Sequence, residues 1–245
     1  WWSKTKNITK ELTMKKIIIT LAVFLFSGLS AQALDRSMFS VTAGVAANQS
    51  VFGASGTETN RSDTNTIASV KKESGVFTDG HQSGFIELNV GDYVSFGFEH
   101  TPDGISTPEN KSREGRSVEN KVSVDFNDLN TTYVKINLPV LSGTYFRAGY
   151  VETDIDVKET HGNGKTYSNA STEGTIVALG YAKGLGESKF GLRFEGAYMD
   201  LDNVSSNNGT ATDGATVANS GRNQIDVSNM EGLTGKIALT LTLGK

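Results

Sequence analysis

The sequence has no cysteine and only three prolines among 245 residues. Without cysteine, the protein has neither a disulfide framework nor a thiolate that binds a metal or acts as a nucleophile. Glycine is abundant, with 27 residues, and accompanies many serine, threonine and asparagine residues. This composition is typical of long β-strands joined by polar loops, because proline cannot donate a hydrogen bond to a sheet.

Basic residues are few and are not clustered. The chain has 23 basic and 27 acidic side chains, and residues 1–33 contain five of the lysines and one glutamate. The remainder therefore carries 18 basic and 26 acidic side chains, a formal net charge of −8. Nucleic-acid binding is excluded on this ground, because phosphate neutralisation needs grouped lysine and arginine.

Residues 14–33 match a secretory signal peptide. Met14 is followed by two lysines, an apolar run over 17–26 and a small-residue site at 31–33, so we expect cleavage before Leu34. The apolar run is too short to cross a membrane as a helix, and a retained N-terminal anchor is the alternative. The residues before Met14 lack an initiator Met and are expected to be an untranslated or upstream extension.

Residues 84–101 have the alternating pattern of a β-hairpin. Apolar and polar residues alternate on both sides of an expected two-residue turn, Gly91-Asp92. Each arm has roughly nine residues, about the length with which a tilted strand crosses a bilayer. One face carries only Ile, Leu, Val and Phe, and the other mixes small polar residues with carboxylates. Apolar outside and polar inside is the pattern of a transmembrane barrel.

The same alternation recurs along the chain and predicts eight strands. Besides the two hairpin arms, we expect strands over 38–46, 121–139 with unbroken alternation, 144–157, 176–182, 190–198 and 225–243. Long polar loops, over 53–83, 102–120, 158–173 and 203–222, alternate with short turns. This is the sidedness of an outer-membrane barrel. The expected fold is all-β, a closed eight-stranded antiparallel up-and-down transmembrane β-barrel over 34–245, since no backbone group stays unpaired in hydrocarbon.

The sequences of two predicted strands add a family resemblance. Segments such as 145–150 (YFRAGY) and 192–198 (LRFEGAY), with the signal peptide and the rhythm of loops and turns, resemble the small eight-stranded outer-membrane proteins. These are the OmpA transmembrane domain, OmpX and the opacity-type surface proteins. The resemblance implies the outer membrane of a Gram-negative bacterium, contact with outer-membrane lipid and lipopolysaccharide, and assembly by the barrel-assembly machinery and periplasmic chaperones.

The role implied by this resemblance is structural or surface-interactive, of an adhesion or receptor-like kind. Four extracellular loops would carry it and could bind an extracellular ligand, with no enzyme activity and no cofactor. Three alternatives remain open. They are a narrow gated pore for ions or small solutes, an outer-membrane enzyme that modifies lipid, and a soluble exported β-sandwich.

The outer face of the expected barrel contacts lipid. The residues predicted to face lipid are Ile86, Leu88, Val94, Phe96, Phe98, Phe146, Leu179, Phe194, Leu239 and Leu241. Three tyrosines fall near the expected membrane boundaries and are predicted to be interfacial anchors. They are Tyr150, Tyr181 and Tyr198.

Charged residues alternate with these and are predicted to face the lumen. An eight-stranded barrel is only wide enough for side chains to fill it, so buried charges there must pair. We interpret them as an internal salt-bridge plug, with a gated narrow pore as the alternative. The predicted network consists of Glu87, Glu99, Lys135, Arg147, Arg193, Glu195 and Lys236.

Two further patterns are candidate sites of chemistry. Glu152, Asp154 and Asp156 alternate on the outer face above Tyr150 and could hold Mg²⁺ or Ca²⁺ against lipopolysaccharide phosphates. A solvated acidic rim is the alternative, and no metal site is assigned. His81-Gln82-Ser83 resembles the His-x-Ser pair of barrel hydrolases that deacylate lipid A, but no carboxylate lies at an orienting spacing. We expect His81 to lie in an exposed loop and assign no catalytic residue.

Overall fold

The computed structural model describes residues 38–61, 66–102, 104–112, 120–160, 167–208 and 224–244. The chain divides into two compact units, Trp1–Met38 and Phe39–Lys245, and every strand belongs to the second unit. The expected upstream extension over 1–13 and the expected signal peptide over 14–33 lie outside the described residues. The described part of the chain holds no helix with the length and apolar character needed to cross a membrane.

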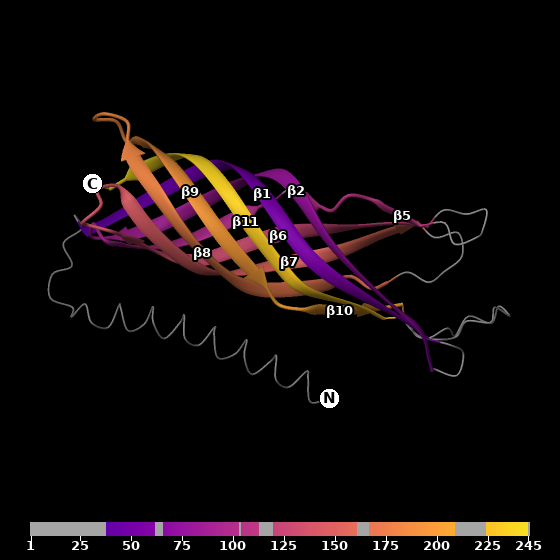
Figure 1. Ribbon diagram of the computed structural model, residues 1–245. Coiled ribbons are helices and arrows are strands. Elements are labelled where there is room, and N and C mark those ends of the chain that lie inside the picture. The colour runs from indigo at the N-terminus through magenta and orange to yellow at the C-terminus, as the bar shows by residue number, and fades with distance from the viewer. Residues whose placement is uncertain are drawn as a thin grey trace. The chain divides into compact units, whose positions relative to one another are not determined.

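Eight strands form a closed antiparallel ring, as the sequence predicts (Figure 1). Neighbours in the ring follow the order of the chain, and β1 closes it by pairing with β11, with Val41 opposite Leu243. The ring strands are β1 (Phe39–Arg61), β2 (Ile67–Val90), β3 (Val94–Thr101), β6 (Asn120–Asn137), β7 (Thr144–Thr160), β8 (Ala170–Gly184), β9 (Phe190–Leu201) and β11 (Gln224–Leu243).

Three short strands extend the sheet at one end of the ring. β4 (Ile105–Ser106) and β5 (Asn110–Ser112) pair with β6, and β10 (Val204–Asn207) pairs with β11. They lie at the end where the chain makes its long connections, which we name the loop end. The opposite end, the turn end, holds the short connections over 91–93, 138–143 and 185–189. The connections from β3 to β6, from β7 to β8 and from β9 to β11 are the longer ones, as predicted, whereas only residues 62–66 separate β1 from β2.

The first expected loop, over 53–83, is mostly strand. β1 continues to Arg61 and β2 begins at Ile67, and the two pair along their whole length. The hydroxyl groups of Ser55 and Ser74 share a hydrogen bond of 2.9 Å. The polar composition predicts a loop, but a ribbon in water needs no apolar outer face. The prediction that His81 lies in a loop is also wrong, because the residue lies within β2.

The β2–β3 turn has three residues, 91–93, instead of the expected two. Gly91 has a φ of +63°, in the left-handed region that glycine enters without a steric cost. Val90 pairs with Val94 across the turn. Both arms therefore keep the register that the alternation predicts.

A β-bulge shifts the register of β6. Asn127 pairs with Asp154 and Asn130 with Glu152, so β6 has one extra residue here. The extra residue moves the side chains beyond it to the other face of the sheet. Unbroken alternation over 121–139 predicts Phe126 on the outer face. The bulge instead turns Phe126 inward, where it packs against buried apolar residues.

Glycines opposite aromatic residues make room for large rings inside the barrel. In each such pair, a Cβ atom on the glycine would overlap the ring opposite. The interior of an eight-stranded barrel is filled by side chains alone, so each ring needs a neighbour that has none. The pairs are Gly44 with Phe85, Gly97 with Tyr133 and Gly180 with Tyr145.

Substitution of Gly180 by alanine is expected to destabilise the barrel by about 1–3 kcal/mol, because the added methyl group overpacks the interior against Tyr145. The matched control is Gly196→Ala on the outer face, where an added Cβ meets no atom within 4 Å. Urea unfolding, followed by the gel mobility difference between folded and unfolded barrel, compares the two variants. Equal stability of both would contradict the packing argument.

Candidate functional site

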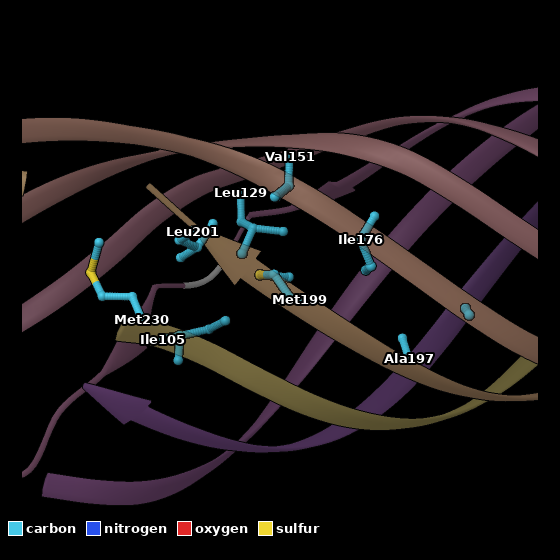
Figure 2. Packing of buried hydrophobic residues seen from close by; sticks show 9 residues of the cluster. Ile105, Leu129, Val151, Ile176, Ala197, Met199, Leu201 and Met230 are labelled. Atoms are coloured by element: carbon cyan, nitrogen blue, oxygen red, sulfur yellow. The ribbon is translucent and has the colours of Figure 1, made fainter. Parts of the chain in front are cut away.

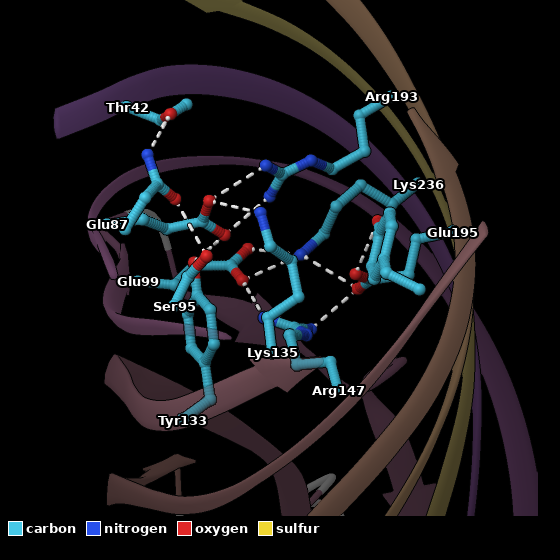
Figure 3. Close-up of polar contacts among 12 residues, drawn as sticks. Thr42, Glu87, Ser95, Glu99, Tyr133, Lys135, Arg147, Arg193, Glu195 and Lys236 are labelled. Atoms are coloured by element: carbon cyan, nitrogen blue, oxygen red, sulfur yellow. Dashed lines mark hydrogen bonds and ion pairs between the residues drawn. The ribbon is translucent and has the colours of Figure 1, made fainter. Parts of the chain in front are cut away.

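Seven charged side chains come together inside the ring of strands (Figure 3). They extend from six strands and are all buried, with between 0 and 7 % of each residue exposed. They are the residues that the alternation places in the lumen. They comprise Glu87, Glu99, Lys135, Arg147, Arg193, Glu195 and Lys236.

Four of the seven form a closed circuit of ion pairs. Arg147 contacts Glu99 at 2.6 Å and Glu195 at 2.7 Å. Lys236 contacts the same two carboxylates, at 2.6 Å and 3.3 Å. Two cations and two anions alternate around this circuit, so its formal charge is zero. Such pairing is what allows charges to stay ionised away from water.

Glu87 forms ion pairs with the other two cationic side chains. Arg193 donates to it through both terminal nitrogens, at 2.7 and 2.9 Å, and Lys135 Nζ donates at 2.6 Å. The two-pronged arginine contact is among the stronger hydrogen-bonded ion pairs. This triad carries one excess positive charge. The ring of Tyr145, whose centroid lies 5.6 Å from Lys135 Nζ, faces that charge with its electron-rich surface.

Aromatic rings cover the two guanidinium groups. Arg147 Cζ lies 4.6 Å from the centroid of Tyr133, and Arg193 Cζ lies 4.8 Å from that of Phe85. These are rings that the facing glycines admit. Hydroxyl groups complete the coordination of the three carboxylates. Tyr133 donates to Glu87 at 3.0 Å, Ser83 to Glu99 at 2.6 Å and Tyr145 to Glu195 at 2.9 Å.

An uncharged polar layer fills the lumen on the turn-end side of the ion pairs. Asn89 Nδ2 donates to Ser40 at 3.0 Å and to Thr42 at 2.9 Å. Ser95 Oγ donates to Asn89 Oδ1 at 2.7 Å, and Thr42 shares a 2.9 Å hydrogen bond with Thr242. These groups satisfy one another, so the layer needs no charge.

An apolar cluster fills the lumen on the loop-end side (Figure 2). The rings of Phe52 and Phe77 stack beside it with centroids 5.3 Å apart. From the turn end to the loop end, the lumen thus holds a hydroxyl and amide layer, an ion-pair layer and an apolar layer. The buried members of the cluster are Ile105, Leu129, Val151, Ile176, Ala178, Ala197, Met199, Leu201 and Met230.

The residues predicted to face lipid all lie on the outer face of the ring. Ile86, Phe98, Phe146, Leu179, Phe194 and Leu239 are exposed, and Leu88, Val94, Phe96 and Leu241 are half-buried. Of the predicted interfacial tyrosines, Tyr181 is 44 % and Tyr198 39 % exposed. Tyr150 has the same outward register but is only 8 % exposed. The structure contradicts an anchoring role there, because a covered ring cannot contact an interface.

His81 and Ser83 both point into the lumen from β2. Ser83 is 4 % exposed, and its hydroxyl donates to Glu99. Since a hydroxyl has one proton, Ser83 does not donate to His81 in this arrangement. Asn48 Nδ2 donates to Ser83 Oγ at 3.0 Å. Ser83 is thus a buried member of the polar network, and His81 is half-buried beside it.

The three outer carboxylates do not form one group. Glu152 and Asp154 are exposed, whereas Asp156 is half-buried and accepts hydrogen bonds from Asn127 at 2.8 Å and Asn169 at 2.7 Å. Within the described ranges, no three His, Cys, Asp or Glu side chains lie close enough together to hold a metal ion.

Sequence reasoning missed the apolar layer, although β7 carries its signal. The outward positions change from Phe146 to the exposed carboxylates Glu152 and Asp154, while Val151 and Ile155 point inward and are buried. The alternation continues, but the apolar face moves from the outside to the inside. A reversal of this kind indicates a strand that leaves lipid and continues in water.

Removal of the Arg147 side chain by alanine is expected to lower the unfolding free energy by about 3–5 kcal/mol, because Glu99 and Glu195 lose a buried cation. The control is Lys111→Ala. Lys111 pairs with Glu109 at 3.3 Å, and the two side chains are 53 % and 46 % exposed, so its removal is expected to change stability little. The hydrogen bond from Lys111 lowers the pKa of Glu109. Similar urea midpoints for the two variants would refute the buried circuit.

No protein-family model matches the sequence, and no curated protein matches it. Among solved structures, the outer membrane protein OprG from Pseudomonas aeruginosa is similar with a TM-score of 0.52 and 11 % identity, over 82 % of this chain and 97 % of that chain. The outer membrane protein AlkL has a TM-score of 0.43 and 13 % identity, over 83 % and 90 % of the two chains.

The outer membrane protease OmpT from Escherichia coli has a TM-score of 0.40 and 10 % identity, over 87 % of this chain and 100 % of that chain. At such low identity, the similarity to OprG bears on the fold alone. The similarity to OprG and the closed ring of paired strands indicate the same fold. The protein has the fold of the small eight-stranded outer-membrane β-barrels.

Proposed function

We propose that this protein spans the outer membrane as a closed barrel and acts through the part of its sheet that projects outside. The polarity of the strands supports the placement. Near the turn end, apolar side chains cover the outer face and the charges lie inside. Beyond Tyr198 this order reverses, with Met199 and Leu201 buried inside and Asp200 exposed. The first part suits hydrocarbon, and the second suits water.

The filled interior is the observation that carries this proposal. Three layers of different chemistry follow one another along the lumen, and the middle one consists of interlocked ion pairs. The cavity among Phe52, Phe77 and Ile105 measures about 20 Å³, room for roughly one water molecule. A lumen filled in this way supports a structural or surface-interaction role over transport.

An enzyme that modifies lipid has no comparable support. A serine nucleophile needs a base that accepts its proton and a hydroxyl that a substrate can reach. The hydroxyl of Ser83 is buried and donates to Glu99 instead. The proposed role is therefore non-enzymatic.

The alternative function, a narrow gated pore, requires two barriers in series to open. The ion-pair layer has a formal charge of +1, from four cations and three carboxylates, and would favour anions once open. The apolar layer would oppose any ion, because an apolar constriction excludes water. Opening only one layer is therefore not expected to produce a channel.

Wild-type protein and Arg193→Ala are both expected to show no unitary conductance in planar bilayers, because the apolar layer still closes the barrel. A triple variant, Arg193→Ala with Met199→Ala and Leu201→Ala, thins both layers and is expected to conduct. Each preparation is first checked for the gel mobility of a folded barrel. Discrete openings of the wild-type protein would contradict the closed-barrel proposal.

A further inference from the structure

The ion-pair layer has an excess of one positive charge, which lies in the triad of Glu87, Arg193 and Lys135. Asp79, a further inner-facing carboxylate of β2, does not balance it. Asp79 is half-buried on the loop-end side of the layer and accepts a hydrogen bond from the backbone N–H of Ser106 at 3.1 Å. A buried charge without a counter-charge is costly. The triad therefore lacks a counter-charge among the described side chains.

Glu87 has no capacity left to accept another hydrogen bond. Its Oε1 accepts from Tyr133 at 3.0 Å and from Arg193 at 2.7 Å. Its Oε2 accepts from Lys135 at 2.6 Å and from Arg193 at 2.9 Å. An ionised carboxylate offers about four acceptor positions in all. These contacts fill them, so any remaining donor of the triad must find its acceptor elsewhere.

Arg193 retains such a donor. Both terminal nitrogens of its guanidinium group point at Glu87 (Figure 3). Its Nε is buried and has no hydrogen-bond partner among the described residues, in a side chain that is 5 % exposed. The Nε–H and the second hydrogen of the adjacent terminal nitrogen lie in one plane and point to the same side. This side edge has the geometry that binds an anion through two hydrogen bonds.

The residues around Arg193 cover the faces of its guanidinium group and supply no acceptor at its edge. The ring centroids of Phe85 and Tyr145 lie 4.8 and 5.2 Å from Arg193 Cζ. On the neighbouring strands, Ala182 and Ala238 pair with Arg193 and share its inner face. Alanine side chains are short and have no polar atom. The side edge therefore suits a small ion and has no side-chain acceptor in the two adjacent strands at this level.

We propose that the lumen binds one monovalent inorganic anion of the halide class at the side edge of Arg193. The anion accepts from Arg193 Nε–H and brings the formal charge of the ion-pair layer from +1 to zero. A divalent anion would leave an excess of negative charge, so a single charge fits best. The proposal rests on the proposed function in one respect, because a closed lumen lacks the bulk water that would otherwise screen the triad.

The first test compares the folded full chain in sodium chloride and in sodium gluconate, whose anion is too bulky for the site. Mixtures of the two salts keep the ionic strength constant, so screening of exposed charges does not change. The urea unfolding midpoint is expected to rise with the chloride concentration, because a ligand that binds only the folded state stabilises it. A midpoint that does not depend on chloride would overturn the proposal.

Two variants separate the excess charge from the donor edge. Lys135→Met keeps an apolar stem and removes the excess charge, so the chloride dependence of the midpoint is expected to disappear. Arg193→Lys keeps the charge but removes the Nε–H, and the chloride concentration for half of the rise is expected to increase at least about tenfold. The matched control, Lys111→Met on an exposed side chain, is expected to behave like the wild type. Wild-type chloride dependence in both lumen variants would refute the site.

The second test locates the ion in the wild-type protein, so it decides the proposal even where a variant does not fold. Anomalous diffraction from crystals grown in sodium bromide is expected to show one peak in the lumen, within hydrogen-bond reach of Arg193 Nε. A lumen without a bromide peak would overturn the proposal and assign this edge to water. A peak elsewhere in the lumen would also overturn it.

These results are independent of the conductance measurement. A non-conducting barrel whose midpoint ignores chloride refutes the anion site and leaves the closed barrel standing. A conducting barrel with the bromide peak at Arg193 refutes the closed barrel and leaves the anion site standing.

Discussion

Backbone pairing is the constraint on which this structure depends. In hydrocarbon, every N–H and C=O must find its partner within the protein, so a sheet that spans a membrane has to close. The ladder between β1 and β11 provides that closure. Closure with eight strands fixes a narrow interior, and a narrow interior leaves space for side chains only. This narrow interior accounts for the glycines that face aromatic rings, for the three lumen layers and for the pairing of each buried carboxylate.

The buried charges contribute to register more than to net stability. An ion pair in a low-dielectric interior recovers little beyond the cost of removing both groups from water. A slip of one residue, however, would turn Glu87 onto the outer face and Ile86 into the lumen, because alternate residues face opposite sides. Because six strands carry these seven charges, a slip of any one of the six would place a charge on the outer face at a high cost in free energy. The ionic layer thus acts together with the apolar outer face to specify one arrangement of the ring.

The sequence predicts the alternation along each strand. It does not predict which residues of different strands come into contact. The period around Ile86 and Glu87 gives the strand and its two faces. It does not say that Arg193 reaches Glu87, because strand tilt and stagger bring together residues 106 positions apart. The bulge near Asp128 has no sequence signal strong enough to predict it. The strands over 53–61 and 67–83 were not predicted, because their polar composition resembles a loop.

The reversal of polarity distinguishes a projecting sheet from a loop. In a loop, side-chain direction follows no period, so the buried and exposed positions beyond the last lipid-facing residue would be irregular. In β9, the period of two continues after Tyr198, with Met199 and Leu201 buried and Asp200 exposed. A strand with this pattern requires an apolar core on its inner side, and the apolar cluster is that core. The part of the sheet at the loop end is therefore a folded continuation of the barrel with a buried apolar core.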